Sequence, residues 1–226
     1  MAEQLGFDLP GVAALGRDDF LVAPSNEIAF AMIDGWQTWP GRKLLLTGPE
    51  GSGKTHLAHV WAALSGAKVI SACDLTADMV PGLAAGSVAV EDTDRIAGNA
   101  QTQQHLFHLH NLVLAESNSL LLTGTGLPQT WDIGLADLAS RLGGTPMVAL
   151  EPPDDALLSA VLAKLFADRQ LMPKPDVIAY LIRRIDRSFA AARDVVCALD
   201  AASLARKKPV SRSLAADLLD KEGPAR

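Results

Sequence analysis

The clearest chemistry in this chain of 226 residues lies in the stretch GPEGSGKT, residues 48–55. It matches the pattern G-x-x-x-x-G-K-[ST] at every fixed position and stands between a short apolar run and a helical pattern. Its glycines let the backbone curl with the N–H groups facing inward, while a lysine and a hydroxyl suit terminal phosphates and magnesium. The predicted phosphate loop comprises Gly48, Pro49, Glu50, Gly51, Ser52, Gly53, Lys54 and Thr55.

Two carboxylates, Glu91 and Asp92, end the later apolar run SVAV. Because the carboxyl ends of parallel strands share one edge of a sheet, we expect both acids beside the phosphate loop. One can hold magnesium, together with Thr55, and the other can orient an attacking water. By position Glu91 is the metal-side acid and Asp92 the catalytic acid, although both could share the metal. The alternative is that the pair caps the segment that follows.

A parallel sheet is needed to bring these residues together, and the apolar patterning predicts one. Helical patterns at about 25–37, 54–66 and 101–117 alternate with short apolar runs, and Ser25 or Asn26 could cap the first helix. The fold class is therefore α/β, with a five-stranded parallel sheet flanked by helices. The five predicted strands are RKLLLTG (42–48), AKVISA (67–72), GSVAVED (86–92), SLLLTGT (119–125) and TPMVALEPP (145–153).

After the double proline at 152–153 the pattern changes, because only helical segments follow. We therefore predict a leader at 1–18, a nucleotide-binding α/β core at 19–151 and a small all-helical lid domain at 152–226, with the prolines as a hinge. The four predicted lid helices lie within 154–170, 173–186, 188–208 and 211–222.

The bulk composition narrows the class of protein. Apolar residues make up 49% of the chain, which can bury a real core, and the net charge of −6 argues against an overall basic surface for nucleic acid. No apolar run is long enough to span a membrane and the N-terminus is not a secretory signal, so we expect a cytoplasmic protein. We expect Cys73 and Cys197 to be buried thiols, and His105, His108 and His110 to be packed or solvated rather than zinc ligands.

Several separate stretches resemble the DnaA/Hda branch of the AAA+ family, over roughly residues 19–205. The resemblance implies an AAA+ core that binds ATP or ADP with Mg2+, and it places His56 beside the nucleotide. The stretches are DDFLVAPSNEIA (18–29), GPEGSGKTHL (48–57), QQHLFHLHNLVLAESNSLLLTGTGLPQTW (103–131), DLASRLGG (137–144) and ARDVVCALDAAS (192–203).

Three further roles follow from this resemblance alone. Arg141, in DLASRLGG, matches the arginine finger that acts in trans on the nucleotide of a neighbouring subunit. Arg193 matches the lid arginine that senses the phosphates of its own subunit. Thr125 stands at the first sensor position, where DnaA has an acid. The ordinary alternatives are a surface salt bridge for Arg141 and a solvated lid position for Arg193.

The leader stretch QLGFDLP, residues 4–10, resembles the short peptides by which replication proteins dock on the sliding clamp. Gln4 would make amide hydrogen bonds, and Leu5, Phe7 and Leu9 would be apolar anchors in a groove. The alternative is that these apolar residues fold back onto the core.

The layout of leader, core and lid, without a DNA-binding domain after the lid, resembles the Hda-type regulators. It implies that the chain promotes hydrolysis of DnaA-bound ATP while docked on the DNA polymerase III sliding clamp (beta subunit), with weak ATPase activity of its own. Homo-oligomers are compatible with this layout, whereas sequence-specific DNA binding and membrane partners are not expected. The alternative is a helicase-loader-type or DnaA-like ATPase that hydrolyses its own ATP.

Overall fold

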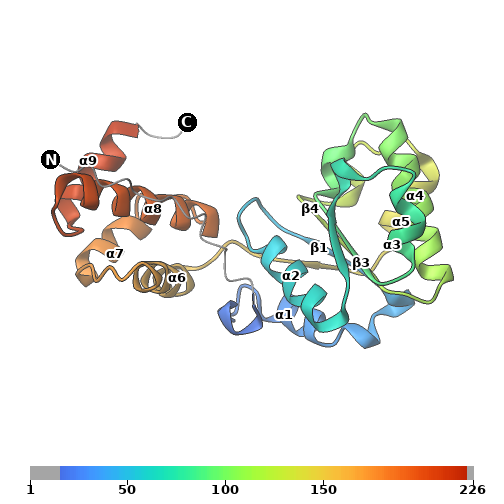
Figure 1. The fold of residues 1–226 in the computed structure, drawn as a ribbon, viewed down its shortest axis with the longest axis horizontal. Coiled ribbons are helices and arrows are strands. Elements are labelled where there is room, and N and C mark those ends of the chain that lie inside the picture. The colour runs from blue at the N-terminus through green and yellow to red at the C-terminus, as the bar shows by residue number, and fades with distance from the viewer. Residues whose placement is uncertain (1–15, 223–226) are drawn as a thin grey trace, which may run out of the picture.

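A computed structural model describes residues 16–222 of the chain and contains the predicted five-stranded parallel sheet (Figure 1). The three central strands are β3, β4 and β1. The last residue pairs are Val90 with Leu122, between β3 and β4, and Thr47 with Gly124, between β1 and β4. The ends of these three strands therefore form one edge. In order across the sheet the strands are β2 (Lys68–Ser71), β3 (Val88–Glu91), β4 (Leu120–Gly124), β1 (Lys43–Thr47) and β5 (Met147–Ala149).

The side chains of each strand alternate between two separate apolar layers. Leu44 and Leu46 of β1 face α1 (Glu27–Asp34) and α2 (Lys54–Ser65). Leu45, between them, faces the opposite layer, which helices α3, α4 and α5 cover. All three leucines are fully buried, as expected for a strand covered on both faces. The bounds of the second layer are α3 (Met79–Ala84), α4 (Ala100–Ala115) and α5 (Ala136–Gly143).

The predicted helices exist, but α1 is shorter than its sequence pattern suggests. It ends at Asp34 and gives way to a 3-10 turn, Trp36–Thr38, because the Trp39 indole donates to the carbonyl of Met32 at 2.7 Å. Asn26 precedes the helix without capping it. Its side chain accepts from the Ala23 N–H at 2.8 Å and donates to the Leu21 carbonyl at 2.9 Å, which folds the segment before α1.

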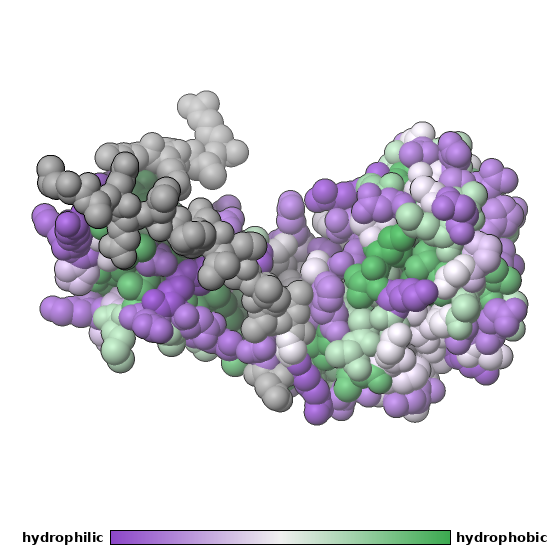
Figure 2. Space-filling view, in the orientation of Figure 1, coloured by the Kyte–Doolittle hydropathy of each residue, from purple (hydrophilic) through white to green (hydrophobic). Residues whose placement is uncertain are grey.

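The lid is a four-helix unit with its own apolar core. Phe166, Leu181, Val196 and Leu199 are fully buried in that core, which shares no residue with the two layers of the sheet. On the visible part of the lid, Figure 2 shows many hydrophilic side chains with some hydrophobic ones between them. The helices are α6 (Asp155–Asp168), α7 (Pro175–Ile182), α8 (Phe189–Arg206) and α9 (Arg212–Glu222).

The prediction that the two cysteines are buried is wrong. Cys73 and Cys197 are both exposed free thiols. Helix α8 turns Val195, Val196 and Leu199 toward the lid core, so Cys197 falls on its outer side, where it accepts from Arg169 at 2.8 Å. Within residues 16–222, no helix is long and apolar enough to cross a membrane.

Candidate nucleotide-binding site

The segment between β1 and α2 folds as a phosphate loop around the Lys54 side chain. Lys54 is only 8% exposed, and its ammonium donates to the carbonyls of Gly48 and Pro49 at 2.8 Å each. Gly48 has a φ of 155°, and a Cβ there would lie 2.7 Å from the Ser52 Oγ. The loop therefore requires glycine at this position, while Thr55 is exposed on the first turn of α2.

The lid meets this loop at Gly51. The Phe189 N–H, at the start of α8, donates to the Gly51 carbonyl at 2.8 Å, and a Cβ on Gly51 would lie 2.8 Å from the Cβ of Ser188. Arg193 lies one helical turn further along α8, is exposed, and has no hydrogen bond or ion pair among the described residues. The predicted lid sensor thus sits on the helix that begins at the phosphate loop.

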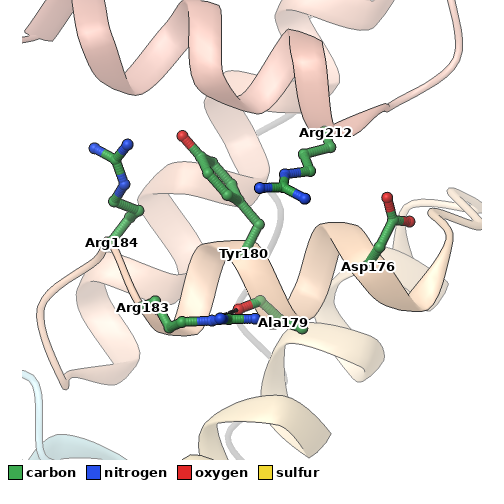
Figure 3. A pocket seen from close by; sticks show the side chains of 6 residues that line it. All are labelled: Asp176, Ala179, Tyr180, Arg183, Arg184 and Arg212. Carbon is green, nitrogen blue, oxygen red and sulfur yellow. Dashed lines mark hydrogen bonds between the residues drawn. The ribbon is translucent and has the colours of Figure 1, made fainter.

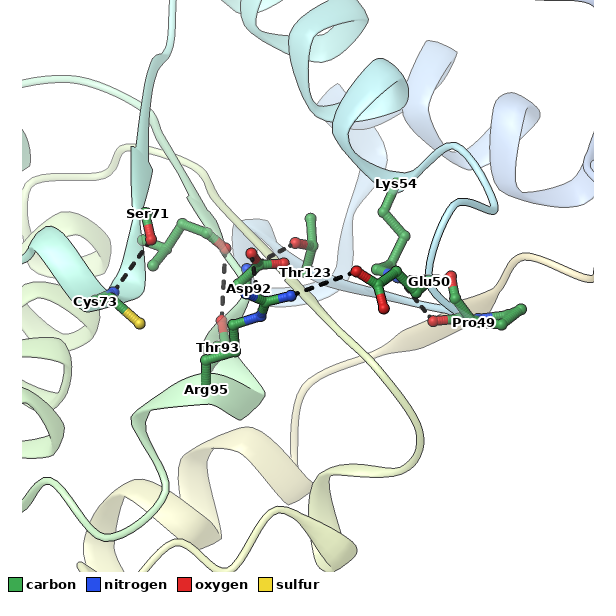
Figure 4. Close-up of polar contacts among 11 residues, drawn as sticks. Pro49, Glu50, Lys54, Ser71, Cys73, Asp92, Thr93, Arg95 and Thr123 are labelled. Carbon is green, nitrogen blue, oxygen red and sulfur yellow. Dashed lines mark hydrogen bonds and ion pairs between the residues drawn. The ribbon is translucent and has the colours of Figure 1, made fainter. Parts of the chain in front are cut away.

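The two predicted acids end β3 at the same edge of the sheet. Asp92 adopts a left-handed backbone conformation, with a φ of 54°, and its N–H donates to the Thr123 hydroxyl at 3.1 Å. Left-handed non-glycine residues cost about 1 kcal/mol and tend to cluster at functional sites. Figure 4 shows that this turn brings Asp92 opposite Lys54 and Glu50 of the phosphate loop.

Arg95 is a site residue that the sequence analysis missed. Its guanidinium lies 3.5 Å from the Asp92 carboxylate and 3.6 Å from that of Glu50, and so bridges β3 to the phosphate loop (Figure 4). All three side chains are substantially exposed, so the bridge is weak, worth about 0–1 kcal/mol. The sequence did contain one signal for this ion pair, because Arg95 follows Asp92 by three residues.

Two carboxylate oxygens in this region are buried without a hydrogen-bond partner in the described part of the chain, Glu91 Oε1 and Asp94 Oδ1. Asp94 was also missed; its Oδ1 lies 3.2 Å from where a Cβ on Gly124 would be. Burial lowers the pKa of Lys54, and the charge of Asp94 is the strongest influence opposing that. The site thus places one buried carboxylate oxygen without a partner among the described residues, that of Asp94, within electrostatic reach of the buried Lys54 ammonium.

Residues 16–222 contain no cluster of three or more His, Cys, Asp or Glu that could hold a metal by itself. Magnesium usually takes one or two protein ligands and completes its shell with water and substrate phosphates. The exposed Thr55 hydroxyl and the unpaired Glu91 Oε1 fit that pattern.

An aromatic group lies beside the first turn of α2. The Phe20 ring stacks on Phe30 with centroids 5.6 Å apart and meets His56 edge-on at 5.2 Å. His56 Nε2 lies 3.0 Å from the Gly16 carbonyl, and burial lowers the pKa of this histidine. His56 therefore connects the N-terminal segment to the first turn of α2. Two rings also pack close to Gly53: a Cβ added there would lie 3.6 Å from Phe20 and 3.2 Å from Phe189.

Thr125 lies just past the end of β4. Its side chain is exposed, and its carbonyl accepts from the Trp131 indole at 2.6 Å. Thr123, two residues earlier, is 1% exposed and bonds Asp92. The β4 hydroxyl that reaches the turn after β3 is therefore that of Thr123, which accepts from the Asp92 backbone N–H.

Arg141 lies apart from this chain's own phosphate loop. Burial, and after it the charge of Arg141, lowers the pKa of Lys43, which begins β1, whereas the loop follows the other end of that strand. Five strand residues separate the two ends by roughly 13 Å. Arg141 is exposed and makes no side-chain hydrogen bond or ion pair in the described structure.

The predicted clamp-binding residues Gln4, Leu5, Phe7 and Leu9 lie outside the described residues.

Comparisons with known proteins place this geometry in a known fold. Domain III of the replication initiation protein DnaA from Thermotoga maritima superposes with a TM-score of 0.80 at 20% identity, covering 94% of this chain and 98% of that one. The chain has a DnaA-like AAA+ fold. AMPPCP-bound DnaA from Aquifex aeolicus matches with a TM-score of 0.68 at 20% identity, over 80% of this chain and 63% of that one.

Sequence similarity leads to the same proteins. The chromosomal replication initiator protein DnaA of Thermomicrobium roseum is 25% identical over 233 residues, covering 92% of this chain and 50% of the relative. The chain thus spans about half the length of the curated relatives it matches. No family model matches the chain.

Proposed function

We propose that this chain is a replication regulator that binds adenine nucleotide and stimulates hydrolysis of ATP bound to DnaA. The observation that carries the proposal is a complete phosphate loop on a DnaA-like fold, together with Arg141, which lies at a distance from the loop and whose side chain has no partner within residues 16–222. Sequence similarity to the DnaA proteins supports a role in replication.

Nucleotide binding would use the loop Gly48–Thr55 and the aromatic group beside it. Lys54 would exchange its two carbonyl partners for phosphate oxygens, which bind an ammonium more strongly. The Phe20 and His56 rings would form an apolar wall for the base. The binding of AMPPCP, an ATP analogue, by a solved DnaA of the same fold supports this assignment.

Thr55 and Glu91 would hold magnesium. Asp92 would either be a further ligand of the ion or polarise the attacking water. When bound, the ion would neutralise charge on the phosphates. Asp92 would orient the attacking water, its backbone fixed by Thr123, and Arg193 would approach the phosphates from the lid. Thr125 remains a sensor only by its sequence position.

Arg141 would serve a partner's nucleotide. An exposed guanidinium that has no partner in the described part of its own chain can enter the site of a neighbouring molecule, where an arginine finger is worth about 10³–10⁵ in rate. DnaA is the proposed neighbour. The leader residues Gln4, Leu5, Phe7 and Leu9 would hold the chain on the sliding clamp.

The experiment is to mix the full chain with ATP-loaded DnaA and DNA-loaded clamp and to follow phosphate release. We expect stimulation that needs the clamp and that Leu5→Ala with Phe7→Ala abolishes, while ADP affinity is unchanged. Stimulation without the clamp, or unaffected by the double change, would contradict clamp docking. No stimulation by the parent chain would contradict the regulatory role.

A second candidate is a helicase-loader-type or DnaA-like ATPase that hydrolyses its own ATP. The proximity of Asp92 and Asp94 to Lys54 favours it, because a full set of acids serves hydrolysis in cis. Rapid turnover by the chain alone, at rates that DnaA does not change, would support this candidate.

A further inference from the structure

A surface pocket on the lid gathers three arginines around one tyrosine. Its volume is about 350 Å³. The lining residues come from α7, the turn that follows it and α9. Figure 1 shows α7 and α9 at the outer part of the lid, whereas α8 begins at the phosphate loop. The pocket is therefore separate from the nucleotide site. Its lining residues are Asp176, Ala179, Tyr180, Arg183, Arg184 and Arg212.

Two of the arginines are held by the tyrosine ring. The guanidinium carbons of Arg184 and Arg212 lie 5.4 and 5.3 Å from the centroid of Tyr180, on either side of it in Figure 3. The negative face of an aromatic ring attracts a guanidinium through its charge and accepts none of its N–H groups as a conventional acceptor would. The arrangement thus fixes two cations in place without using their donors.

These donors have few acceptors of their own. Arg212 makes no hydrogen bond or ion pair within residues 16–222, and Arg184 has only a 3.7 Å contact with the exposed Asp220. Arg183 donates one N–H to the Ala179 carbonyl at 3.0 Å. Asp176 is the one acid among the lining residues, so the pocket carries excess positive charge and excess donors.

The whole lid shares this sign. Residues 152–226 contain 13 Lys and Arg against 10 Asp and Glu, whereas residues 1–151 contain 7 against 16. Lys207 and Lys208 are exposed just before α9 begins with Arg212. An extended polyanion would therefore be attracted to the lid and repelled by the core domain.

We propose that the Tyr180–Arg184–Arg212 cluster binds the phosphodiester backbone of a nucleic acid without reading its sequence. With Arg183, which also lines the pocket, three guanidiniums supply more donors than the two oxygens of a carboxylate can accept, whereas successive phosphates can accept from each in turn. The inference goes beyond the proposed function and rests on different residues.

The test uses the full chain and a fluorescein-labelled oligothymidylate of about 20 nucleotides, with anisotropy measured from about 50 mM salt upward. Arg184→Ala with Arg212→Ala should weaken binding by about tenfold and reduce the slope of log K against log salt by about 1.4, or 0.7 for each lost phosphate contact. The matched control, Arg42→Ala with Lys68→Ala, removes two charges from exposed positions of the core domain.

A gain-of-binding variant protects the test against loss of folding. Asp176→Lys, on the exposed first turn of α7, should tighten binding, because it replaces the lining acid with a cation. No binding by the parent chain at low salt, equal losses in both double variants, or unchanged affinity in Asp176→Lys would overturn the proposal. Loss of binding to phosphatidylserine vesicles with unchanged oligonucleotide binding would also overturn it, and would identify a lipid-headgroup site.

Discussion

The core domain and the lid differ in charge as well as in secondary structure. The core has more than twice as many acids as bases, and Glu50, Asp92 and Asp94 lie around its phosphate loop, whereas the lid is net basic. A nucleoside triphosphate held by the core alone would meet two cations, the buried Lys54 and the exposed Arg95, among several carboxylates. We expect cations of the lid, Arg193 among them, to add positive charge to the site when the lid lies over it.

The two regions already contact each other at two points. Phe189 bonds Gly51 of the phosphate loop, and Lys164 of α6 donates to Asp19 at 2.8 Å. The hydrogen bond from Lys164 lowers the pKa of Asp19, and the same bond raises the pKa of Lys164. The lid position is thus joined to the loop by backbone contact and to the N-terminal segment by charge.

The largest effect is expected at the single cation that the core places in its phosphate loop. Lys54→Ala should reduce affinity for Mg-ADP by at least about 100-fold, because two or more charge-assisted hydrogen bonds are lost. Isothermal calorimetry measures this, with Lys68→Ala, at an exposed position of β2, as the control. Unchanged affinity of Lys54→Ala for Mg-ADP would contradict the assignment of the nucleotide site to this loop.

The next largest effect concerns the stability of the core alone. His110 is 2% exposed, and burial first, then the charges of Lys43 and Arg141, lower its pKa to about 4. Keeping His110 neutral in the folded state contributes about 3 kcal/mol to the free energy of unfolding. This contribution is fully present above pH 6.5 and is lost as the pH falls toward 4. Urea titrations at several pH values between 7 and 4 measure the free energy of unfolding. This free energy should fall less steeply with decreasing pH in His110→Leu than in the parent.

The exposed His108, two positions earlier on α4, gives the control variant His108→Leu. A slope that changes equally in both variants would show that His110 is not the group responsible.

Much of this architecture could be predicted from the sequence, because it depends on local patterns. The buried leucines of β1, the glycine-rich turn and the cap at Gly66 are all encoded within a few residues. The sheet prediction was confirmed for the same reason, since alternating strands and helices leave few ways to connect them.

The missed residues depend on contacts that no local pattern states. Arg95 and Asp94 reach the site only because Asp92 turns the chain through a left-handed conformation after β3. Thr123 matters because β4 happens to lie beside β3, which the order of strands in the chain does not reveal. The exposed Cys197 shows that a residue type alone does not set which face of a helix it occupies.

A smaller effect is expected for coupling between the regions. Arg193→Ala should reduce by about fivefold the protection that ADP gives the lid against limited proteolysis, because a cation from α8 no longer favours the closed state. The matched control is Arg206→Ala at the other end of α8, which is paired with Asp217. Identical protection in Arg193→Ala and the parent would show that Arg193 does not couple the position of the lid to the bound nucleotide.

The smallest effect should come from the Lys164–Asp19 pair, whose side chains are about one-third exposed. Lys164→Ala should slightly increase proteolysis of the lid without nucleotide, and the difference should shrink in high salt. Because Asp19 has a lowered pKa, the pair contributes above the ordinary pKa of the carboxyl and is lost as pH falls through the lowered value. A difference that is insensitive to salt would point to packing instead.

The most direct test of the regulatory account is single-turnover hydrolysis of labelled ATP preloaded on DnaA, with DNA-loaded clamp present. Arg141→Ala should lower the stimulated rate by about 10³-fold or more while keeping the affinity of this chain for ADP, because the finger acts on the partner's nucleotide. Arg42→Ala, another exposed core arginine, should retain full stimulation. Full stimulation by Arg141→Ala would contradict the account.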